Sequence, residues 1–280
     1  MEVYEKAYAK INLTLNVLGK REDGYHDLLM IMTPISLMDE LIIEDSHCDD
    51  VSCNIDELNG RNNIVFKTIE TIKSSYDIDR SVKVTVNKKI PIGAGLGGGS
   101  ADCAATLRGL NKLWELNLSL DELADIGLEL GADVPFCVYN RQAVVSGIGE
   151  QIKFIDGLSS YVVLVNPNEQ VSTKRIFEST DLNYIKKHID QHISLFREND
   201  ISSLKKILFN DLQDITLSIS SECRKIYEII NDVDDSFLMT GSGSTFFSIY
   251  SNYNKANKIA EILSKKGINS IVATIMCNNC

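Results

Sequence analysis

Residues 91–102 read PIGAGLGGGSAD, and five of these twelve residues are glycine. Glycine loses more backbone freedom on folding than any other residue, so a loop this rich in glycine suggests a backbone that must come very close to another group. Backbone N–H groups that lead into a helix N-terminus bind anions, which makes phosphate the first candidate. The flanking sequence agrees, because the alternating valines of residues 82–86 predict a strand before the loop and residues 101–114 predict a helix after it.

Two nucleotide-binding patterns match this loop by letter. Gly93-x-Gly95-x-x-Gly98 matches the Rossmann fingerprint, but that motif needs a second strand ending in an acidic residue about 20 positions further on. Here the corresponding span, LWELNLSLDEL, predicts a helix end and the start of another helix. The spacing also matches a P-loop, and Ser100 stands where that motif has Ser or Thr. However, Gly99 stands where the motif has the lysine that reaches the terminal phosphates. The loop can therefore cradle phosphate with its backbone, while positive charge must come from elsewhere in the chain.

Candidate charged groups lie in three places. Lys88 comes just before the loop, and Lys10 lies on a strand predicted over 3–17, whose odd positions are mostly apolar and whose even positions include Asn12. A lysine is most often a solvated surface residue, but one among polar neighbours on a strand face can point into a site. Asp133 lies in GADVPFCV, which is otherwise apolar, so its carboxylate must be hydrogen-bonded, ion-paired or functional.

The composition is that of an ordinary globular protein. The chain has 280 residues, of which 44% are hydrophobic and 24% charged, and no apolar run approaches the roughly 20 residues that span a bilayer. The formal net charge of −11 argues against general binding to nucleic acid or anionic membranes. The N-terminus has no apolar signal core, which predicts a cytoplasmic protein. Seven scattered cysteines predict no disulfide framework, and the tail from Cys277 to Cys280 lacks the second ligand pair of a zinc site.

The order of predicted elements indicates an α+β protein with a domain boundary near residues 157–160, which gives domains 1–156 and 157–280. In the first domain the patterns predict further strands at 28–33, 40–45, 51–55, 143–147 and 151–155, a helix from Asn62 or Asn63 to about Ser74, and a helix with a Ser119–Glu122 capping box that ends at Gly131. In the second domain they predict a strand at 161–167, helices across about 172–232, a strand–turn–strand at 237–250, a helix at 254–266 and a strand at 270–276.

These residues carry a resemblance to a known superfamily. PIGAGLGGGSADCAA resembles the phosphate loop of the GHMP kinases, and five further motifs resemble, in order, those of the kinases that act on 4-diphosphocytidyl-2-C-methyl-D-erythritol. The motifs are AKINLTLNVLGKREDGYHDL at 9–28, NNIV at 62–65, GADVPF at 131–136, FNDLQ at 209–213 and MTGSGSTFF at 239–247. The loop alone indicates only the superfamily, whereas the ordered set covers nearly the whole chain.

The resemblance implies a two-domain GHMP kinase fold, with a ribosomal S5 domain 2-like N-terminal domain, a ferredoxin-like C-terminal domain and the active site in the cleft between them. It implies ATP-dependent phosphorylation of a substrate hydroxyl to the 2-phosphate, a step of non-mevalonate isoprenoid precursor biosynthesis. The implied cofactors are ATP and Mg²⁺, and the partner is a small molecule that carries a cytidine diphosphate group. No nucleic acid or membrane partner is expected, and the expected state is a monomer or weak homodimer.

Individual residues match the motif positions of these kinases. Lys10 and Asp133 match the catalytic pair, with Asp133 as general base and Lys10 holding it ionised and countering phosphoryl charge. The residues that match ATP-binding positions are Pro91, Ile92, Gly93, Ala94, Gly95, Leu96, Gly97, Gly98, Gly99, Ser100, Ala101, Asn63 and Lys88. The residues that match substrate-binding positions are Asn12, Tyr25, His26, Gly241, Ser242 and Gly243, with Tyr25 and His26 at the cytosine.

The chain departs from the family pattern at two positions. Thr240 stands where serine is usual, which keeps a hydroxyl, and Ala101 replaces a serine often found after Ser100. If that serine touches phosphate or metal, Ser100 must suffice, so no protein ligand of Mg²⁺ is assigned. Three alternatives stay open: another small-alcohol kinase, a pyridine-dinucleotide oxidoreductase, which the missing second strand disfavours, and an inactive nucleotide-binding regulator, which intact Lys10 and Asp133 argue against.

Overall fold

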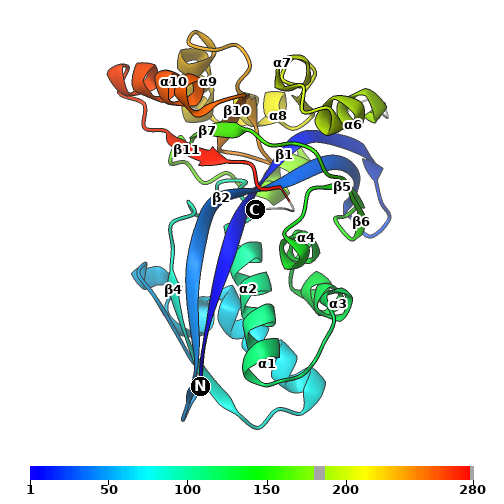
Figure 1. Cartoon of the computed structure of the whole chain (residues 1–280), viewed down its shortest axis with the longest axis vertical. Coiled ribbons are helices and arrows are strands. Elements are labelled where there is room, and N and C mark those ends of the chain that lie inside the picture. Colours follow the sequence, from blue (N-terminus) through cyan, green and yellow to red (C-terminus); the bar gives the residue numbers. More distant parts are fainter. Residues whose placement is uncertain (180–186, 278–280) are drawn as a thin grey trace. The chain divides into compact units, whose positions relative to one another are not determined.

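The computed structural model describes residues 1–179 and 187–277 (Figure 1). Contacts divide the chain into two compact units. Unit 1 consists of Met1–Ala9, Leu37–Ile90 and Gly97–Asn140, and unit 2 consists of Lys10–Ser36, Pro91–Leu96 and Arg141–Cys280. The units alternate along the chain, so that strands β1 (Glu2–Lys20) and β2 (His26–Ser46) contribute residues to both.

Unit 1 combines strands with four α-helices (Figure 1). Strand β4 (Ser81–Asn87) pairs parallel with β3 (Asp50–Cys53) and antiparallel with the part of β2 from Glu40 to Ser46. Helix α2 (Gly98–Leu113) contacts α1 (Ile64–Tyr76), α3 (Leu120–Leu130) and α4 (Val134–Tyr139). The short 3₁₀ helices η1 (Asp56–Leu58) and η2 (Gly60–Asn62) precede α1. Helix α2 can take this central position because small side chains bury on it, including Ala101, Ala104 and Ala105.

Helix starts in unit 1 follow their capping residues. The Asn63 side chain accepts a hydrogen bond from the Val65 N–H at 3.0 Å, which confirms the predicted start of α1. Ser119 and Glu122 form the predicted reciprocal capping box at α3. Helix α2 begins three residues earlier than predicted, at Gly98, with Gly97 in the left-handed region at φ 69°. Two glycines of the triple run therefore belong to the helix rather than to the loop.

Unit 2 contains a four-stranded antiparallel sheet in the order β11–β7–β10–β9. Strand β7 (Tyr161–Val165) pairs with β10 (Phe246–Tyr250) and β11 (Ile271–Thr274), and β10 pairs with β9 (Leu238–Met239). Helix α10 (Tyr253–Lys265) packs on β7, β10 and β11. Among the described residues between β7 and β9, the helices are α5 (Thr173–Glu178), α6 (Asp190–Arg197), α7 (Ile201–Leu204), α8 (Gln213–Ile219) and α9 (Ser221–Asn231). This β–α–β–β–α–β order is the ferredoxin-like arrangement that was predicted.

Additional strands of unit 2 pair with the two long strands. Strand β5 (Ala143–Gly147) pairs antiparallel with Leu28–Met32 of β2 and with β6 (Gln151–Phe154). The two-residue strand β8 (Phe209–Asn210) pairs parallel with β1 at Thr14 and Leu15. Strand β8 has no counterpart in the sequence prediction, and the strands predicted at 28–33 and 40–45 are parts of the single strand β2.

Strand β1 differs from its prediction in burial. The odd-numbered face is buried as expected, but the polar even-numbered face is buried as well, including Lys10 and Asn12, which are 4% and 1% exposed. Buried polar groups need hydrogen-bond partners, so this face must meet polar groups from elsewhere in the chain.

Three predictions concern the domain boundary, part of the helical region and the C-terminal cysteine pair. The predicted boundary at 156/157 stays a prediction. Part of the predicted helical region, residues 180–186, and the end of the C-x-x-C tail, Cys280, lie outside the described residues. Over the part of the chain that the structure describes, no helix combines the length and apolarity needed to cross a membrane.

Candidate active site

Lys10 lies on the polar face of β1 within unit 2. Its ammonium donates a hydrogen bond to the Asn12 side-chain oxygen at 2.8 Å, and its backbone N–H donates to the Leu96 carbonyl oxygen at 3.0 Å. A Cβ added at Gly241 would lie 3.4 Å from the Lys10 Nζ. The β9–β10 turn therefore approaches the ammonium closely, at a position where glycine leaves room.

Thr240 fixes the amide group that Lys10 contacts. The Asn12 backbone N–H donates to the Thr240 hydroxyl oxygen at 2.9 Å, and the Thr240 hydroxyl donates to the Asn12 side-chain oxygen at 3.3 Å. Thr240 is completely buried. Both hydrogen bonds are made by the Thr240 hydroxyl, which serine also carries. Threonine can therefore replace the serine that is usual at this position in the kinases that the motifs resemble.

The first half of the glycine loop, residues 91–96, packs against the same turn. The Thr245 N–H donates to the Ala94 carbonyl oxygen at 3.1 Å. Gly95 has φ 75°, and a Cβ there would collide with the Thr240 carbonyl oxygen and lie 2.9 Å from that of Gly243. Glycine at this position is required both by the backbone conformation and by the contact with the turn.

The FNDLQ motif supports the turn and β1 through two neighbouring side chains. The Asn210 amide donates to the carbonyl oxygens of Met239 and Gly241 at 2.7 and 2.8 Å. The Asp211 carboxylate accepts from the Asn16 side chain at 2.7 Å and from the Val17 N–H at 2.9 Å. Sequence reasoning recognised this motif but assigned no role to its residues, because their partners are distant in sequence.

The two residues expected at the cytosine differ in exposure. Tyr25 is 59% exposed, whereas His26 is buried and stacks on Phe177 of α5, with ring centroids 5.0 Å apart and an interplanar angle of 28°. Burial lowers the pKa of His26, so its ring is neutral at pH 7. The same helix meets the β9–β10 turn, because the hydroxyls of Thr173 and Ser242 lie 2.7 Å apart. Sequence reasoning missed Phe177, since an aromatic residue in a helix is usually a core residue.

In unit 1 the start of α2 lies beside two segments that carry predicted site residues. A Cβ added at Gly99 would meet Ile64, the first residue of α1, at 3.9 Å. The Ser100 hydroxyl lies 3.9 Å from the position of a Cβ at Gly131, two residues before Asp133. Asp133 is half-buried at the N-cap position of α4, and its side chain makes no capping hydrogen bond.

The Asn63 side chain is committed to local structure. Besides accepting from the Val65 N–H, it donates to the Leu58 carbonyl oxygen at 2.8 Å. Asn63 thereby holds the turn before α1 and the first turn of that helix, close to the start of α2.

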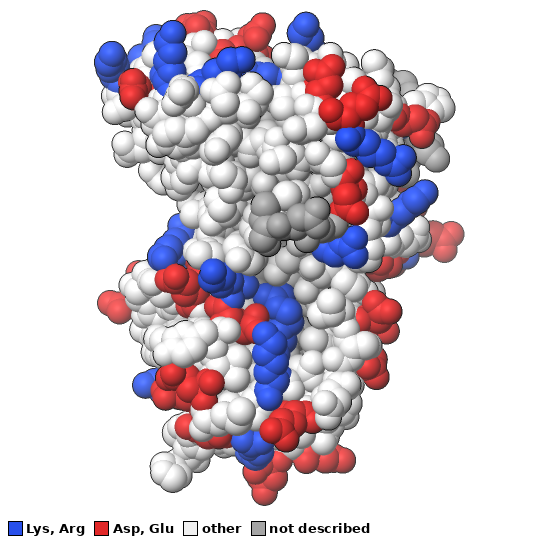
Figure 2. All heavy atoms as spheres, in the orientation of Figure 1, with Lys and Arg blue, Asp and Glu red and all other residues white. Residues whose placement is uncertain are grey.

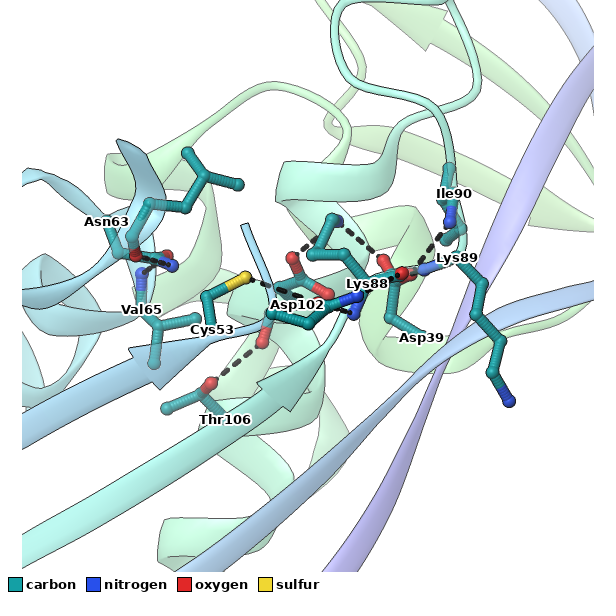
Figure 3. A network of polar contacts seen from close by, with 11 residues as sticks. Asp39, Cys53, Asn63, Val65, Lys88, Lys89, Ile90, Asp102 and Thr106 are labelled. Atoms are coloured by element: carbon teal, nitrogen blue, oxygen red, sulfur yellow. Dashed lines mark hydrogen bonds and ion pairs between the residues drawn. The ribbon is translucent and has the colours of Figure 1, made fainter. Parts of the chain in front are cut away.

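Lys88 forms a buried ion cluster with two aspartates (Figure 3). Its ammonium lies 2.5 Å from an Asp39 oxygen and 2.7 Å from an Asp102 oxygen, and all three side chains are at most 4% exposed. Burial raises the pKa of Asp102 to about 7. Burial acts to lower the pKa of Lys88, but the two carboxylates outweigh it, so this pKa lies above its ordinary value. Sequence reasoning singled out Lys88 but neither aspartate.

The two predicted catalytic residues fall in different units, Lys10 in unit 2 and Asp133 in unit 1. Their pairing stays a prediction. Lys10, Asn12 and Gly241 do come together within unit 2. In residues 1–179 and 187–277, no group of three or more His, Cys, Asp or Glu side chains is arranged to hold a metal ion.

Positive charge for a polyanionic ligand must be local. The chain has 39 acidic and 28 basic residues, and on the face drawn in Figure 2 acidic side chains lie among the basic ones. An anion bound at the start of α2 would be stabilised by the N–H groups and dipole of that 16-residue helix.

Comparison with protein families gives two matches. The model described as GHMP kinases N terminal domain matches residues 63–141, and the model described as GHMP kinases C terminal matches residues 193–269. The two matched ranges lie on either side of the expected domain boundary.

Comparison with individual proteins gives matches over nearly the whole chain. The chain is 41% identical to a Streptococcus uberis protein over 266 residues, which cover 92% of this chain and 94% of that protein. It is 38% identical to the 4-diphosphocytidyl-2-C-methyl-D-erythritol kinase of Bacillus cereus over 265 residues, 92% of each chain.

Comparison with solved structures agrees. A crystal structure of 4-(cytidine 5'-diphospho)-2C-methyl-D-erythritol kinase is similar with a TM-score of 0.82 and 28% identity, covering 98% of this chain and 99% of that one. Homoserine kinase from Cytophaga hutchinsonii is similar in fold, with a TM-score of 0.73 and 17% identity over 99% of this chain and 95% of that one.

Proposed function

Because this chain belongs to the 4-diphosphocytidyl-2-C-methyl-D-erythritol kinase family of the GHMP kinases, we propose that it transfers the γ-phosphoryl group of ATP to a hydroxyl of 4-diphosphocytidyl-2-C-methyl-D-erythritol. The products are the 2-phosphate and ADP, and the reaction is a step of non-mevalonate isoprenoid precursor biosynthesis. The observation that carries this proposal is the identity of about 40% to relatives over 92% of the chain. The matches also confirm the predicted two-domain GHMP kinase fold.

Asp133 is the proposed general base. The substrate hydroxyl oxygen attacks the γ-phosphorus, the bond from that phosphorus to the ADP oxygen breaks, and the hydroxyl proton passes to the Asp133 carboxylate. An alcohol is a poor nucleophile at neutral pH, and such proton removal typically contributes about 10²–10⁴-fold in rate. Support comes from the match of Asp133 to the catalytic position of the GADVPF motif, and its side chain is half-buried at the start of α4. Lys10, held by Asn12, is proposed to counter negative charge on the transferring group.

The nucleotide phosphates are proposed to bind the backbone of residues 91–101. Support comes from the left-handed Gly97 at the N-cap of α2 and from Gly99, where an added Cβ would meet only the Ile64 side chain, at 3.9 Å, among described residues other than its helix neighbours. Asn63 and Lys88 are proposed to contribute to ATP binding. The Asn63 side chain holds the start of α1, and Lys88 pairs with Asp102 near the start of α2.

Mg²⁺ is proposed as the metal that accompanies ATP. Mg²⁺ usually keeps several waters and takes only one or two protein oxygens beside the substrate phosphates, so a dedicated cluster of acidic ligands is not required. The half-buried Ser100 hydroxyl in the first turn of α2 is an oxygen of this kind. When bound, the metal would neutralise phosphate charge.

The cytidine end of the substrate is proposed to bind at Tyr25 and His26, and the alcohol end near Asn12. The neutral, buried ring of His26 suits hydrogen bonding and stacking with a base rather than charge pairing. The backbone of Gly241, Ser242 and Gly243 is proposed to approach the substrate. We also propose a cytoplasmic location, a monomer or weak homodimer, and no nucleic acid or membrane partner.

A coupled assay of ADP release tests the function. We expect turnover with 4-diphosphocytidyl-2-C-methyl-D-erythritol and far poorer turnover with free methylerythritol. Equal use of both alcohols would contradict the proposed substrate.

Asp133→Asn tests the mechanism because it keeps the shape of the side chain and removes the base. We expect kcat to fall by about 10²–10⁴-fold while both substrates still bind. The control is the melting temperature, which should stay close to that of the unmodified protein. A stable variant with nearly normal kcat would exclude Asp133 as the base.

A further inference from the structure

Lys88 is poorly placed to bind phosphate directly. Its ammonium is enclosed by the carboxylates of Asp39 and Asp102 at 2.5 and 2.7 Å, with 4% of the side chain exposed. Two carboxylates already balance or exceed the one positive charge, so the cluster offers no net positive potential to a polyanion nearby. Turning the ammonium toward a ligand would leave both carboxylates buried without their counter-ion, which is strongly unfavourable.

The same cluster connects the two chain segments that flank the glycine loop. Asp39, on β2, accepts hydrogen bonds from the N–H groups of Lys89 and Ile90 at 2.5 and 2.8 Å, directly before the loop (Figure 3). Asp102 lies in the second turn of α2, the helix that begins directly after the loop. Lys88 bridges the two carboxylates.

Contacts at the start of α2 strengthen this link. A Cβ added at Gly98, the first residue of α2, would lie 3.2 Å from the Lys88 Nζ and 3.0 Å from the Ile90 side chain. The first turn of the helix therefore rests on the residues that lead into the loop. Among residues 1–179 and 187–277, the other Asp102 oxygen is buried and has no hydrogen-bond partner, so Lys88 is the main counter-group of this carboxylate.

We propose that Asp39, Lys88 and Asp102 are positioning residues that hold both ends of the glycine loop, so that its backbone N–H groups are already aligned for phosphate. This inference rests on the proposed function, since it assigns the cluster to ATP binding. It replaces a direct contact between Lys88 and ATP by an effect through the loop. The ordering is provided before the ligand arrives, which lowers the entropy lost on binding.

The two interpretations of Lys88 predict opposite effects of losing a carboxylate. If Lys88 contacts phosphate directly, Asp39→Ala releases positive charge and ATP binding stays equal or becomes tighter. If the cluster positions the loop, Asp39→Ala frees the two N–H groups before the loop, and the Kd for ATP measured by calorimetry rises at least tenfold. Asp39→Asn keeps an acceptor for those N–H groups, so we expect a smaller rise of about threefold, and KM for the alcohol should stay within twofold in both variants.

Glu5 provides a matched control. Its buried carboxylate also pairs with α2, through Arg108 at 3.1 Å and Lys112 at 2.5 Å, but in the later turns of the helix rather than at the loop. Glu5→Ala should lower the melting temperature and leave the Kd for ATP within twofold. An equal loss of ATP binding in Glu5→Ala would mean general loosening of unit 1 and would overturn the inference.

The remaining outcomes are also decisive. Unchanged or tighter ATP binding in a folded Asp39 variant overturns the positioning role, and if Asp39→Ala does not fold, Asp39→Asn alone decides the question. Calorimetry needs no alcohol substrate. If the unmodified protein binds ATP but does not phosphorylate the cytidine-bearing alcohol, the proposed substrate fails while the positioning role is still judged on ATP binding.

Discussion

Asp102 has a pH-dependent consequence for stability. Burial raises its pKa in the folded protein to about 7, whereas an ordinary aspartate has a pKa near 3.8. Between these values the folded state holds a proton that the unfolded state has lost, so this group stabilises the fold below about pH 4 and loses that effect as the pH rises to about 7. Lys88 pairs with this carboxylate at 2.7 Å and acts to lower its pKa, whereas the nearby Asp39 carboxylate acts to raise it.

Asp102→Asn removes this titration and keeps the side-chain shape. We expect the free energy of unfolding of the unmodified protein, relative to the variant, to fall between pH 5 and 7 by up to about 1.4 kcal/mol per pH unit. Urea denaturation at pH 5, 6, 7 and 8 measures it. His26 and His192, whose pKa values burial lowers, contribute with the opposite sign but equally in both proteins, so the difference isolates Asp102. Parallel pH profiles would contradict the expectation.

At the scale of residues, the motifs led to Lys10, Asp133 and the loop, because those residue types recur at fixed places in sequence. They did not lead to Asp39, which lies 49 residues before its partner Lys88 on an ordinary strand. Asp102 likewise reads as a polar residue near a helix start. Buried ion pairs of this kind are set by tertiary contacts, which local sequence does not encode.

At the scale of elements, two glycines of the loop should respond differently to alanine. Gly95→Ala places a side chain at φ 75° against the Thr240 carbonyl, so we expect a loss of about 2 kcal/mol or more in unfolding free energy. Gly99→Ala lies in helical backbone with its nearest added contact at 3.9 Å, so stability should be unchanged or rise by up to about 1 kcal/mol.

Although Gly99→Ala should not reduce the stability of the protein, we expect it to weaken ATP binding. If the phosphates approach the backbone at this position, the added methyl group should weaken ATP binding by more than tenfold, or about 1.4 kcal/mol. Thermal melting and ATP calorimetry of both variants measure the two effects. Normal ATP affinity in Gly99→Ala would mean that the glycine run serves helix packing alone.

Element prediction succeeded where the signal is local. The Asn63 cap, the Ser119 capping box and the alternating valines of β4 each act through neighbouring residues, and each appears in the structure. Prediction failed for β8, since a two-residue strand has no periodicity and its partner on β1 lies about 195 residues away. The burial of the polar face of β1 was missed because partners such as Thr240 lie far away in sequence.

At the scale of the whole molecule, unit 2 depends on residues from the N-terminal part of the chain. Thr14 pairs with Phe209, Asn12 bonds Thr240, and Ile35 forms a bridge with Ile275. A fragment of residues 157–280, the expected C-terminal domain, lacks the first partner of each pair. We expect this fragment to show no cooperative thermal transition by circular dichroism, whereas the full chain should. A cooperative transition with full helical content would contradict this and support 156/157 as a folding boundary.

The contact between Asn12 and Thr240 also sets a delay during synthesis. The two residues are 228 positions apart, and a ribosome that adds about 5–20 residues per second needs roughly 10 to 50 seconds to make the second after the first. Throughout that interval Asn12 on the nascent β1 lacks the Thr240 hydroxyl that later bonds both its backbone N–H and its side-chain oxygen. The polar face of β1 around Asn12 therefore cannot complete its hydrogen bonding until translation of the β9–β10 turn is complete.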